Sequence, residues 1–250
     1  MSHTTADQWL SGFQGQRLRT KVRDQLVVVT LDNAPVNALD SVFYQEIHDV
    51  FQALSVSDSV SAVLLRADHR CFCAGQDRRD APVPPADPAT YLRNAAAALI
   101  AATQCPVPMV AGVKGAAIGA GFILALSADV LVLDADATLS LPELKFGVIS
   151  GYAHLSQWVG QGAAQAVLTG DHIDAHALIS GGAIVIPTNE VDAEAERLAN
   201  SIAESAPSFI KATKSSWMNE RKLVADAYRQ EIELTIDQGS MNFSLPMSAD

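Results

Sequence analysis

The stretch from Pro106 to Asp129, PVPMVAGVKGAAIGAGFILALSAD, constrains the fold more than any other part of this chain. Its apolar run 107–113 predicts a buried strand, and the glycines and alanines of 115–121 predict a tight turn into an apolar helix. The first turn of a helix presents unpaired N–H groups and the positive end of the helix dipole, and small residues let a ligand approach the backbone. The turn therefore predicts a site for negative charge, either a phosphate or the oxyanion of an activated carbonyl.

Length and charge limit what can bind at this turn. A chain of 250 residues buries roughly 70% of its unfolded surface, so it needs no disulfide or metal for stability. Its formal net charge of −11 argues against a nucleic-acid partner, because such proteins concentrate Lys and Arg. The first fifteen residues lack a basic segment followed by an apolar one, and no apolar run reaches membrane-spanning length. We therefore expect a cytoplasmic protein without a membrane partner.

The three cysteines, Cys71, Cys73 and Cys105, lack the spaced pairs that a zinc site uses. No third cysteine lies near the first two in the sequence. We therefore expect no metal, and interpret the cysteines as buried reduced thiols of a cytosolic protein.

Hydrophobic periodicity predicts alternating strands and helices followed by a helical tail, which is typical of the α/β class. The predicted strands are 18–22, 26–31, 62–66, 107–113, 129–133 and 183–186. The predicted helices are one begun by Asp40 or Ser41, then 91–104, 152–158, 162–168, 175–179, 192–204 and 208–236. The proline-rich segment 81–88 predicts a surface loop, which either closes over the site or simply links two elements.

Two kinds of chemistry fit poorly. Gly115, Gly119 and Gly121 have the glycine spacing of short-chain dehydrogenases, but that motif belongs on a first strand, and here over a hundred residues precede it. None of the four tyrosines has a lysine four residues later, as those enzymes require. Ser150 lacks the G-x-S-x-G spacing of a hydrolase nucleophile, which leaves the oxyanion as the favoured ligand.

Several motifs, in shared order and spacing over roughly residues 17–215, resemble the crotonase superfamily, the enoyl-CoA hydratases and isomerases. They are Pro35–Leu39, Phe72–Asp77, Pro108–Asp129, Leu141–Gly147, Leu168–Gly170, 175–182, Ala206-Pro207 and Lys214. The resemblance implies a crotonase-like ββα superhelical core over residues 1–190 and a C-terminal helical trimerisation region over 191–250. It also implies a homotrimer or a pair of trimers.

The resemblance implies a chemistry as well. Members hold the thioester carbonyl of an acyl-CoA with two backbone N–H groups, which here belong to Gln76 and Ala120. Glu143 matches a family acid/base position, and burial in an apolar cleft would raise the pKa of its carboxyl. The alternative for Glu143 is a surface glutamate in a loop. Coenzyme A is part of the substrate, so no separate cofactor is expected.

Ile123 stands where two-carboxylate hydratases carry a second glutamate. One carboxylate suits a proton shuttle, so the resemblance favours an isomerase that turns a 3-enoyl-CoA into a 2-enoyl-CoA, and a glutamate at this position would bring hydration. Tyr152 and His154 are candidates for a second acid/base group, which keeps hydratase, decarboxylase and hydrolase reactions open. A non-catalytic acyl-CoA-binding scaffold is the alternative from another class.

The remaining expected contacts involve the acyl group and coenzyme A. Arg78 and Arg79 follow the second glycine motif, and with Lys214 they are candidates for the nucleotide of CoA, although two adjacent arginines are equally typical of a solvated surface. The full set of expected substrate and CoA contacts is Ala38, Ala74, Asp77, Arg78, Arg79, Ile123, Tyr152, His154 and Lys214.

Overall fold

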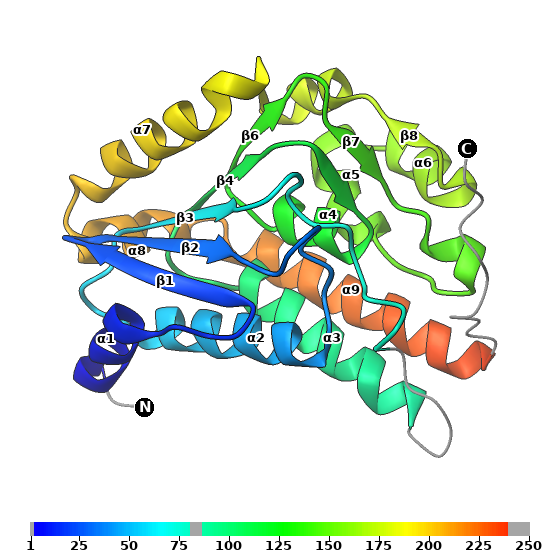
Figure 1. Cartoon of the computed structure of the whole chain (residues 1–250), viewed down its shortest axis with the longest axis horizontal. Coiled ribbons are helices and arrows are strands. Elements are labelled where there is room, and N and C mark those ends of the chain that lie inside the picture. Colours follow the sequence, from blue (N-terminus) through cyan, green and yellow to red (C-terminus); the bar gives the residue numbers. More distant parts are fainter. Residues whose placement is uncertain (1–2, 81–86, 240–250) are drawn as a thin grey trace.

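The computed structural model describes residues 3–80 and 87–239, and its centre is a six-stranded sheet (Figure 1). The strand order is β1-β2-β3-β4-β6-β9, with β1 antiparallel to β2 and the other neighbours parallel. The bounds are β1 Leu18–Arg23, β2 Leu26–Leu31, β3 Ala62–Ala67, β4 Met109–Val113, β6 Val130–Asp134 and β9 Ile184–Ile186. The predicted α/β class is confirmed.

Helices cover both faces of this sheet, which explains why every residue of β2 is buried. Alternate side chains of β2 point to opposite faces. Leu26 and Val28 pack with Val191 and Ala195 of α7 (Val191–Ala203), while Val27 and Val29 belong to the larger core. In Figure 1, α7 lies on one side of the sheet, and α2 (Ser41–Val56), α3 (Pro88–Thr103) and α9 (Met218–Gln238) lie on the other.

A second, three-stranded sheet carries the glycine-rich segment. It consists of β5 (Ala116–Ile118), β7 (Thr138–Ser140) and β8 (His172–Ile173) in the order β5-β7-β8. The sequence predicts only a turn over 115–121, so β5 is a correction. Its short strand forms because parallel pairing with β7 and a bridge between Cys73 and Ala117 satisfy its backbone.

The remaining helices differ from the prediction at three places. The N-terminal residues form α1 (His3–Gly12), because Ala6 and Leu10 are fully buried in the core. Residues Ala175–Gly181 form a 3-10 helix. The predicted helix 208–236 is two helices, α8 (Pro207–Ser215) and α9, separated at Ser216 and Trp217.

The other helical elements are α4 Ala120–Leu126, η1 Glu143–Phe146, α5 Tyr152–Val159, α6 Gly162–Thr169 and η3 Thr188–Glu190. Of the predicted loop 81–88, residues 81–86 lie outside the described residues. No helix within the described ranges combines the length and apolarity needed to cross a bilayer. The division at residue 190 stays a prediction, and α7 packs directly on the sheet.

Candidate active site

Two backbone segments from distant parts of the chain approach each other at the candidate site. Leu39 forms a parallel bridge with Gln76: its N–H donates to Gly75 O at 2.8 Å, and its carbonyl accepts from Asp77 N at 2.8 Å. In such a bridge the flanking residues make the hydrogen bonds, so the N–H of Gln76 itself points away from Leu39. The second segment lies alongside the first: a Cβ placed on Gly75 would be 2.6 Å from Ile118 O and 3.8 Å from Ala120 N.

The second segment contributes the start of α4. Gly119 has a φ of 55°, a conformation that favours glycine, and its N–H donates to Ser140 O at 2.9 Å. The helix begins at Ala120, whose N–H belongs to the first turn and has no acceptor within the helix. The backbone N–H groups of Gln76 and Ala120 can thus converge on one oxygen atom of a ligand.

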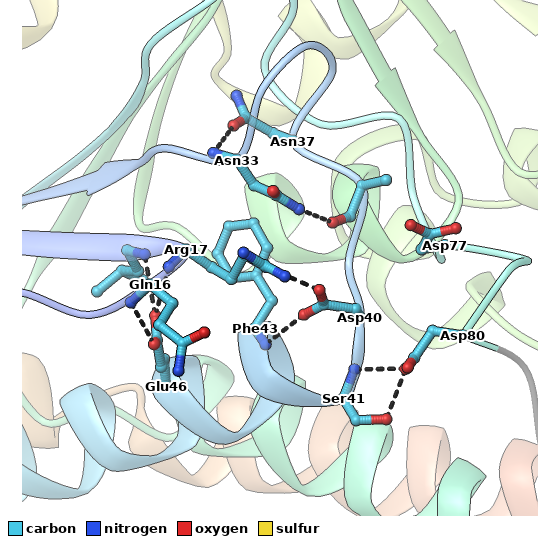
Figure 2. Close-up of polar contacts among 12 residues, drawn as sticks. Gln16, Arg17, Asn33, Asn37, Asp40, Ser41, Phe43, Glu46, Asp77 and Asp80 are labelled. Carbon is cyan, nitrogen blue, oxygen red and sulfur yellow. Dashed lines mark hydrogen bonds and ion pairs between the residues drawn. The ribbon is translucent and has the colours of Figure 1, made fainter.

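The loop 33–41 holds the first segment in place (Figure 2). Figure 2 shows Asn33 Nδ2 donating to Ala38 O at 2.8 Å. Asn37 Nδ2 donates to Phe72 O at 3.2 Å. Asp40 caps α2 by accepting from Phe43 N at 2.8 Å, and it pairs with Arg17 at 2.7 Å. Ala38 therefore supports the segment through its carbonyl group and is not among the residues that line the cavity.

Glu143 faces these donors from the first position of η1. A Cβ on Gly119 would lie 2.2 Å from Glu143 Oε1, so the carboxyl group touches the backbone at Gly119. The residue as a whole is half-buried, but its Oε2 is sealed from solvent and has no hydrogen-bond partner among the described residues. Burial of the carboxyl group, with a smaller contribution from the charge of Glu231, raises the pKa of Glu143 from 4.5 to about 8. Glu143 can therefore carry a proton near neutral pH.

An apolar cavity opens between the two backbone segments and Glu143. Its walls come from α2, α3 and α9 and from the chain around η1. The lining residues include Tyr44, Leu92, Ala95, Leu99, Ile118, Phe146, Val148, Ser150, Tyr228 and Ile232. An apolar wall of this kind suits the hydrocarbon part of a ligand and strengthens the electrostatic interactions inside.

Helix α9 holds one wall of this cavity through polar contacts. Glu231 accepts hydrogen bonds from Gly151 N and Ala153 N, both at 2.7 Å, next to the first turn of α5. Thr235 Oγ1 accepts from Ile149 N at 2.8 Å, and Tyr228 of α9 and Ser150 both line the cavity. Burial raises the pKa of Glu231 to about 7. Sequence reasoning missed this set, because only the fold brings α9 to the segment 149–153.

Five of the expected site residues line the cavity. They are Ala74, Gln76, Arg78, Ala120 and Glu143. The guanidinium of Arg78 lies 4.8 Å from the centre of the Phe146 ring.

Two further expected contacts form a pair beside the cavity. Arg79 donates through two nitrogens to the carboxylate of Asp77, at 2.7 and 3.0 Å, and its side chain is 87% exposed. The hydrogen bonds from Arg79 lower the pKa of Asp77.

The structure does not bring the other expected residues to the cavity. Ile123 is fully buried in the core beneath it. His154 points into the core, where Nε2 lies 2.9 Å from Thr103 Oγ1, and burial lowers its pKa to about 3. Tyr152 is 39% exposed on another face of α5.

Lys214 is also placed away from the cavity. It is buried and donates to Asp129 at 2.7 Å and Val107 O at 3.0 Å. Its positive charge is therefore compensated inside the protein.

Comparison with known proteins identifies the family to which this geometry belongs. The family described as enoyl-CoA hydratase/isomerase matches residues 21–242. The chain belongs to this family. The predicted resemblance to the crotonase superfamily is confirmed, and so is the crotonase-like fold with its C-terminal helices.

Individual members of the enoyl-CoA hydratase/isomerase family differ in their reactions. The chain is 32% identical to a (7aS)-7a-methyl-1,5-dioxo-2,3,5,6,7,7a-hexahydro-1H-indene-carboxyl-CoA hydrolase of Mycobacterium tuberculosis, over 85% of this chain and 88% of that protein. It is 29% identical to a carnitinyl-CoA dehydratase of Proteus mirabilis, over 90% and 84%. An enoyl-CoA hydratase/isomerase structure from Xanthobacter autotrophicus Py2 superposes with a TM-score of 0.80 at 26% identity, covering 92% of this chain and 90% of that chain. This chain is therefore an acyl-CoA enzyme of the family.

Proposed function

We propose that this enzyme moves a double bond, converting a 3-enoyl-CoA into the conjugated 2-enoyl-CoA. The observation that carries the proposal is the make-up of the cavity: of the described residues that line it, Glu143 alone has a carboxyl group. Adding water in the two-carboxylate members needs a second carboxylate, and here that position is the buried Ile123. A single carboxyl group with a pKa of about 8 suffices to take and return one proton.

The proposed reaction uses the two backbone donors and Glu143. The N–H groups of Gln76 and Ala120 hold the thioester oxygen, and the Glu143 carboxylate removes a proton from C2. The electron pair of that C–H bond forms a dienolate whose negative charge rests on the thioester oxygen. Glu143 then returns the proton to C4, which leaves the double bond between C2 and C3. Each donor is typically worth ~10²–10³ in rate, because the oxygen gains charge only during the reaction.

Coenzyme A enters as part of the substrate, and we propose that Arg78 and Arg79 contact its phosphates. Arg78 lines the cavity, and the exposed Arg79 stands next to it. The buried pairing of Lys214 with Asp129 removes that lysine from the candidates.

Addition of water is the second candidate. Tyr228 and Ser150 both line the cavity, and two hydroxyl groups there can hold a water molecule. The names of the relatives, a hydrolase and a dehydratase, agree with water chemistry in this family. Tyr228 and Ser150 replace Tyr152 and His154 as candidates for the second acid/base group.

Assembly is a further part of the proposal. We expect a homotrimer or a pair of trimers, and two exposed apolar side chains support it: Phe209 of α8 is 75% exposed and Leu223 of α9 is 69% exposed. Light scattering that returned the mass of one chain would contradict this expectation.

The deciding experiment is to incubate the purified enzyme separately with a 3-enoyl-CoA and a 2-enoyl-CoA, and to record thioester absorbance and product mass. Conjugation of the 3-enoyl substrate without a change in mass supports the isomerase. Gain of one water by the 2-enoyl substrate, at a rate equal to or above isomerisation, supports the second candidate instead.

A further inference from the structure

The side-chain amide of Gln76 is a hydrogen-bond donor without an acceptor. Its Nε2 is sealed from solvent and has no partner among the described residues, yet Gln76 lines the same cavity as Glu143. Leaving a buried donor unpaired costs about 1–3 kcal/mol. Such groups are rare in folded proteins, and each one calls for an explanation, such as a catalytic role or a bound water, ion or ligand that pairs with it.

The residues that line the cavity with Gln76 offer its amide few hydrogen-bond acceptors. The cavity walls nearby are hydrocarbon, from residues such as Leu92, Leu99 and Ile232. Glu143 Oε2, an acceptor in the same cavity, is itself unpaired and so does not satisfy Gln76. Within the described part of the chain the amide has no acceptor, and a ligand bound in this cavity would supply one.

The thioester oxygen is not the acceptor that this amide requires. In the proposed function that oxygen already receives two backbone N–H groups, one of them from Gln76 itself. Gln76 lines the apolar cavity that also holds Glu143, and in the proposed function this cavity takes the acyl chain, so the acceptor belongs to the acyl group. An amide N–H is a pure donor, and its natural partner in an apolar cavity is a pure acceptor, a carbonyl oxygen.

We propose that the acyl group of the substrate carries a second carbonyl oxygen, which accepts a hydrogen bond from Gln76 Nε2. The substrate class is then an oxoacyl-CoA and not a plain hydrocarbon acyl-CoA. This inference rests on the proposed function only in placing the thioester carbonyl at Gln76 and Ala120. It does not depend on which bond the enzyme changes.

Equilibrium binding to saturated ligands tests this inference without turnover. Calorimetry would compare hexanoyl-CoA with 3-oxo-, 4-oxo- and 5-oxohexanoyl-CoA, on the wild type and on Gln76→Met, which keeps the length and the backbone N–H. We expect at least one oxo ligand to bind wild type about ten-fold more tightly than hexanoyl-CoA. We expect Gln76→Met to lose that preference, so that its Kd values for hexanoyl-CoA and for every oxo ligand lie within about two-fold of one another.

Two controls separate this interaction from changes in cavity shape. Leu99→Met alters another wall of the cavity, and it should change the Kd of all four ligands alike. Binding of hexanoyl-CoA relative to coenzyme A alone reports whether the acyl-CoA site itself exists. Failure of the isomerase assay leaves the oxo preference intact, so the two proposals fail separately.

The inference is overturned if no oxo ligand binds wild type more tightly than hexanoyl-CoA. It is also overturned if Gln76→Met weakens all four ligands equally, because the amide then serves the thioester or the cavity shape. If 3-hydroxyhexanoyl-CoA binds more tightly than every oxo ligand, the group that pairs with Gln76 Nε2 is a hydroxyl and not a carbonyl, and the inference is overturned.

Discussion

Gly119 and Glu143 are in such close contact that a single methyl group on Gly119 would lie 2.2 Å from Glu143 Oε1. Gly119, the residue that precedes helix α4 of the candidate oxyanion site, thus also fixes the position of the carboxyl group. The positions of the Ala120 N–H donor and of the Glu143 carboxyl group therefore depend on one contact, and a shift of either group displaces the other.

Gly119→Ala should lower kcat/KM at least 100-fold, because the added methyl group displaces the Glu143 carboxyl group. Gly160→Ala is a matched control. Gly160 has a φ of 56° and a ψ of −132°, against 55° and −128° at Gly119, but nothing lies within 4 Å of its Cβ position. Both variants carry the same backbone strain, of order 1–3 kcal/mol. Equal activities in the two variants would therefore show that the methyl group at position 119 does not displace the Glu143 carboxyl group.

Glu143→Gln should reduce turnover by several orders of magnitude, because an amide cannot take a proton from C2. Its Kd for a saturated acyl-CoA should stay within about two-fold of wild type, since the backbone donors are unchanged. Single-turnover kinetics and calorimetry measure the two quantities. Turnover comparable to wild type would remove Glu143 from the mechanism.

The pH profile of kcat/KM should rise about ten-fold per pH unit below pH 8 and level off above it, because only the carboxylate form of Glu143 is a base. A profile that is flat from pH 5.5 upward would contradict the raised pKa. Stability should change in the opposite direction. The folded protein binds this proton more tightly than the unfolded chain, so the stabilisation is complete below pH 4.5 and is lost by about pH 8.

The same linkage gives a stability test of Glu143. Above pH 8, wild type holds a charged and desolvated carboxylate, whereas Glu143→Gln does not. We expect the variant to have the higher Tm at pH 9, because its free energy of unfolding should be larger by on the order of 1 kcal/mol or more. Near pH 4 the two Tm values should converge, and a constant difference across this range would argue against titration of Glu143.

Glu231→Ala should destabilise the protein by about 1–3 kcal/mol, because the N–H groups of Gly151 and Ala153 lose their acceptors. The cavity wall at Ser150 should loosen, and kcat/KM should fall about ten-fold or more. Glu233→Ala is the control on the same helix, where an exposed pair with Arg93 is lost at little cost. If the two variants behave alike in thermal unfolding and kinetics, α9 does not position the wall.

Ile123→Glu should unfold or aggregate the protein rather than introduce hydration. The sequence suggests that a glutamate here would activate water, but Ile123 is fully buried in the core. An unpaired carboxyl group at that point costs several kcal/mol, roughly 3 or more. Ile123→Val, at about 0.5–1.5 kcal/mol, is the conservative control. A folded Ile123→Glu enzyme that hydrates a 2-enoyl-CoA would show that the side chain reaches the cavity.

The parts of the site that sequence predicts are those carried by local motifs. The glycines around Gln76 and Ala120 and the Leu-Pro-Glu motif at Glu143 each specify a short backbone shape, and the structure brings all three to one cavity. Tyr152 and His154 were wrongly placed because the direction of a side chain depends on the phase of α5, which starts at Tyr152. That phase turns His154 toward Thr103 and Tyr152 toward solvent.

Long-range partners account for the rest. Lys214 lies on a polar helix, where a solvated ammonium is the expectation, and only the fold supplies Asp129 from 85 residues away. Glu231 likewise meets Gly151 across 80 residues. Neither contact leaves a local pattern in the sequence, so the functional wall that α9 supports could not be predicted.

The tethering of residues 149–153 by α9 also has a consequence for biosynthesis. Five of the six strands of the large sheet, the glycine-rich turn and Glu143 precede residue 150, but the cavity wall is held by Glu231 and Thr235. A nascent chain of two hundred residues therefore contains almost every proposed catalytic group but lacks the helix that holds the cavity wall. The contacts that hold residues 149–153 can therefore form only after α9 has left the exit tunnel.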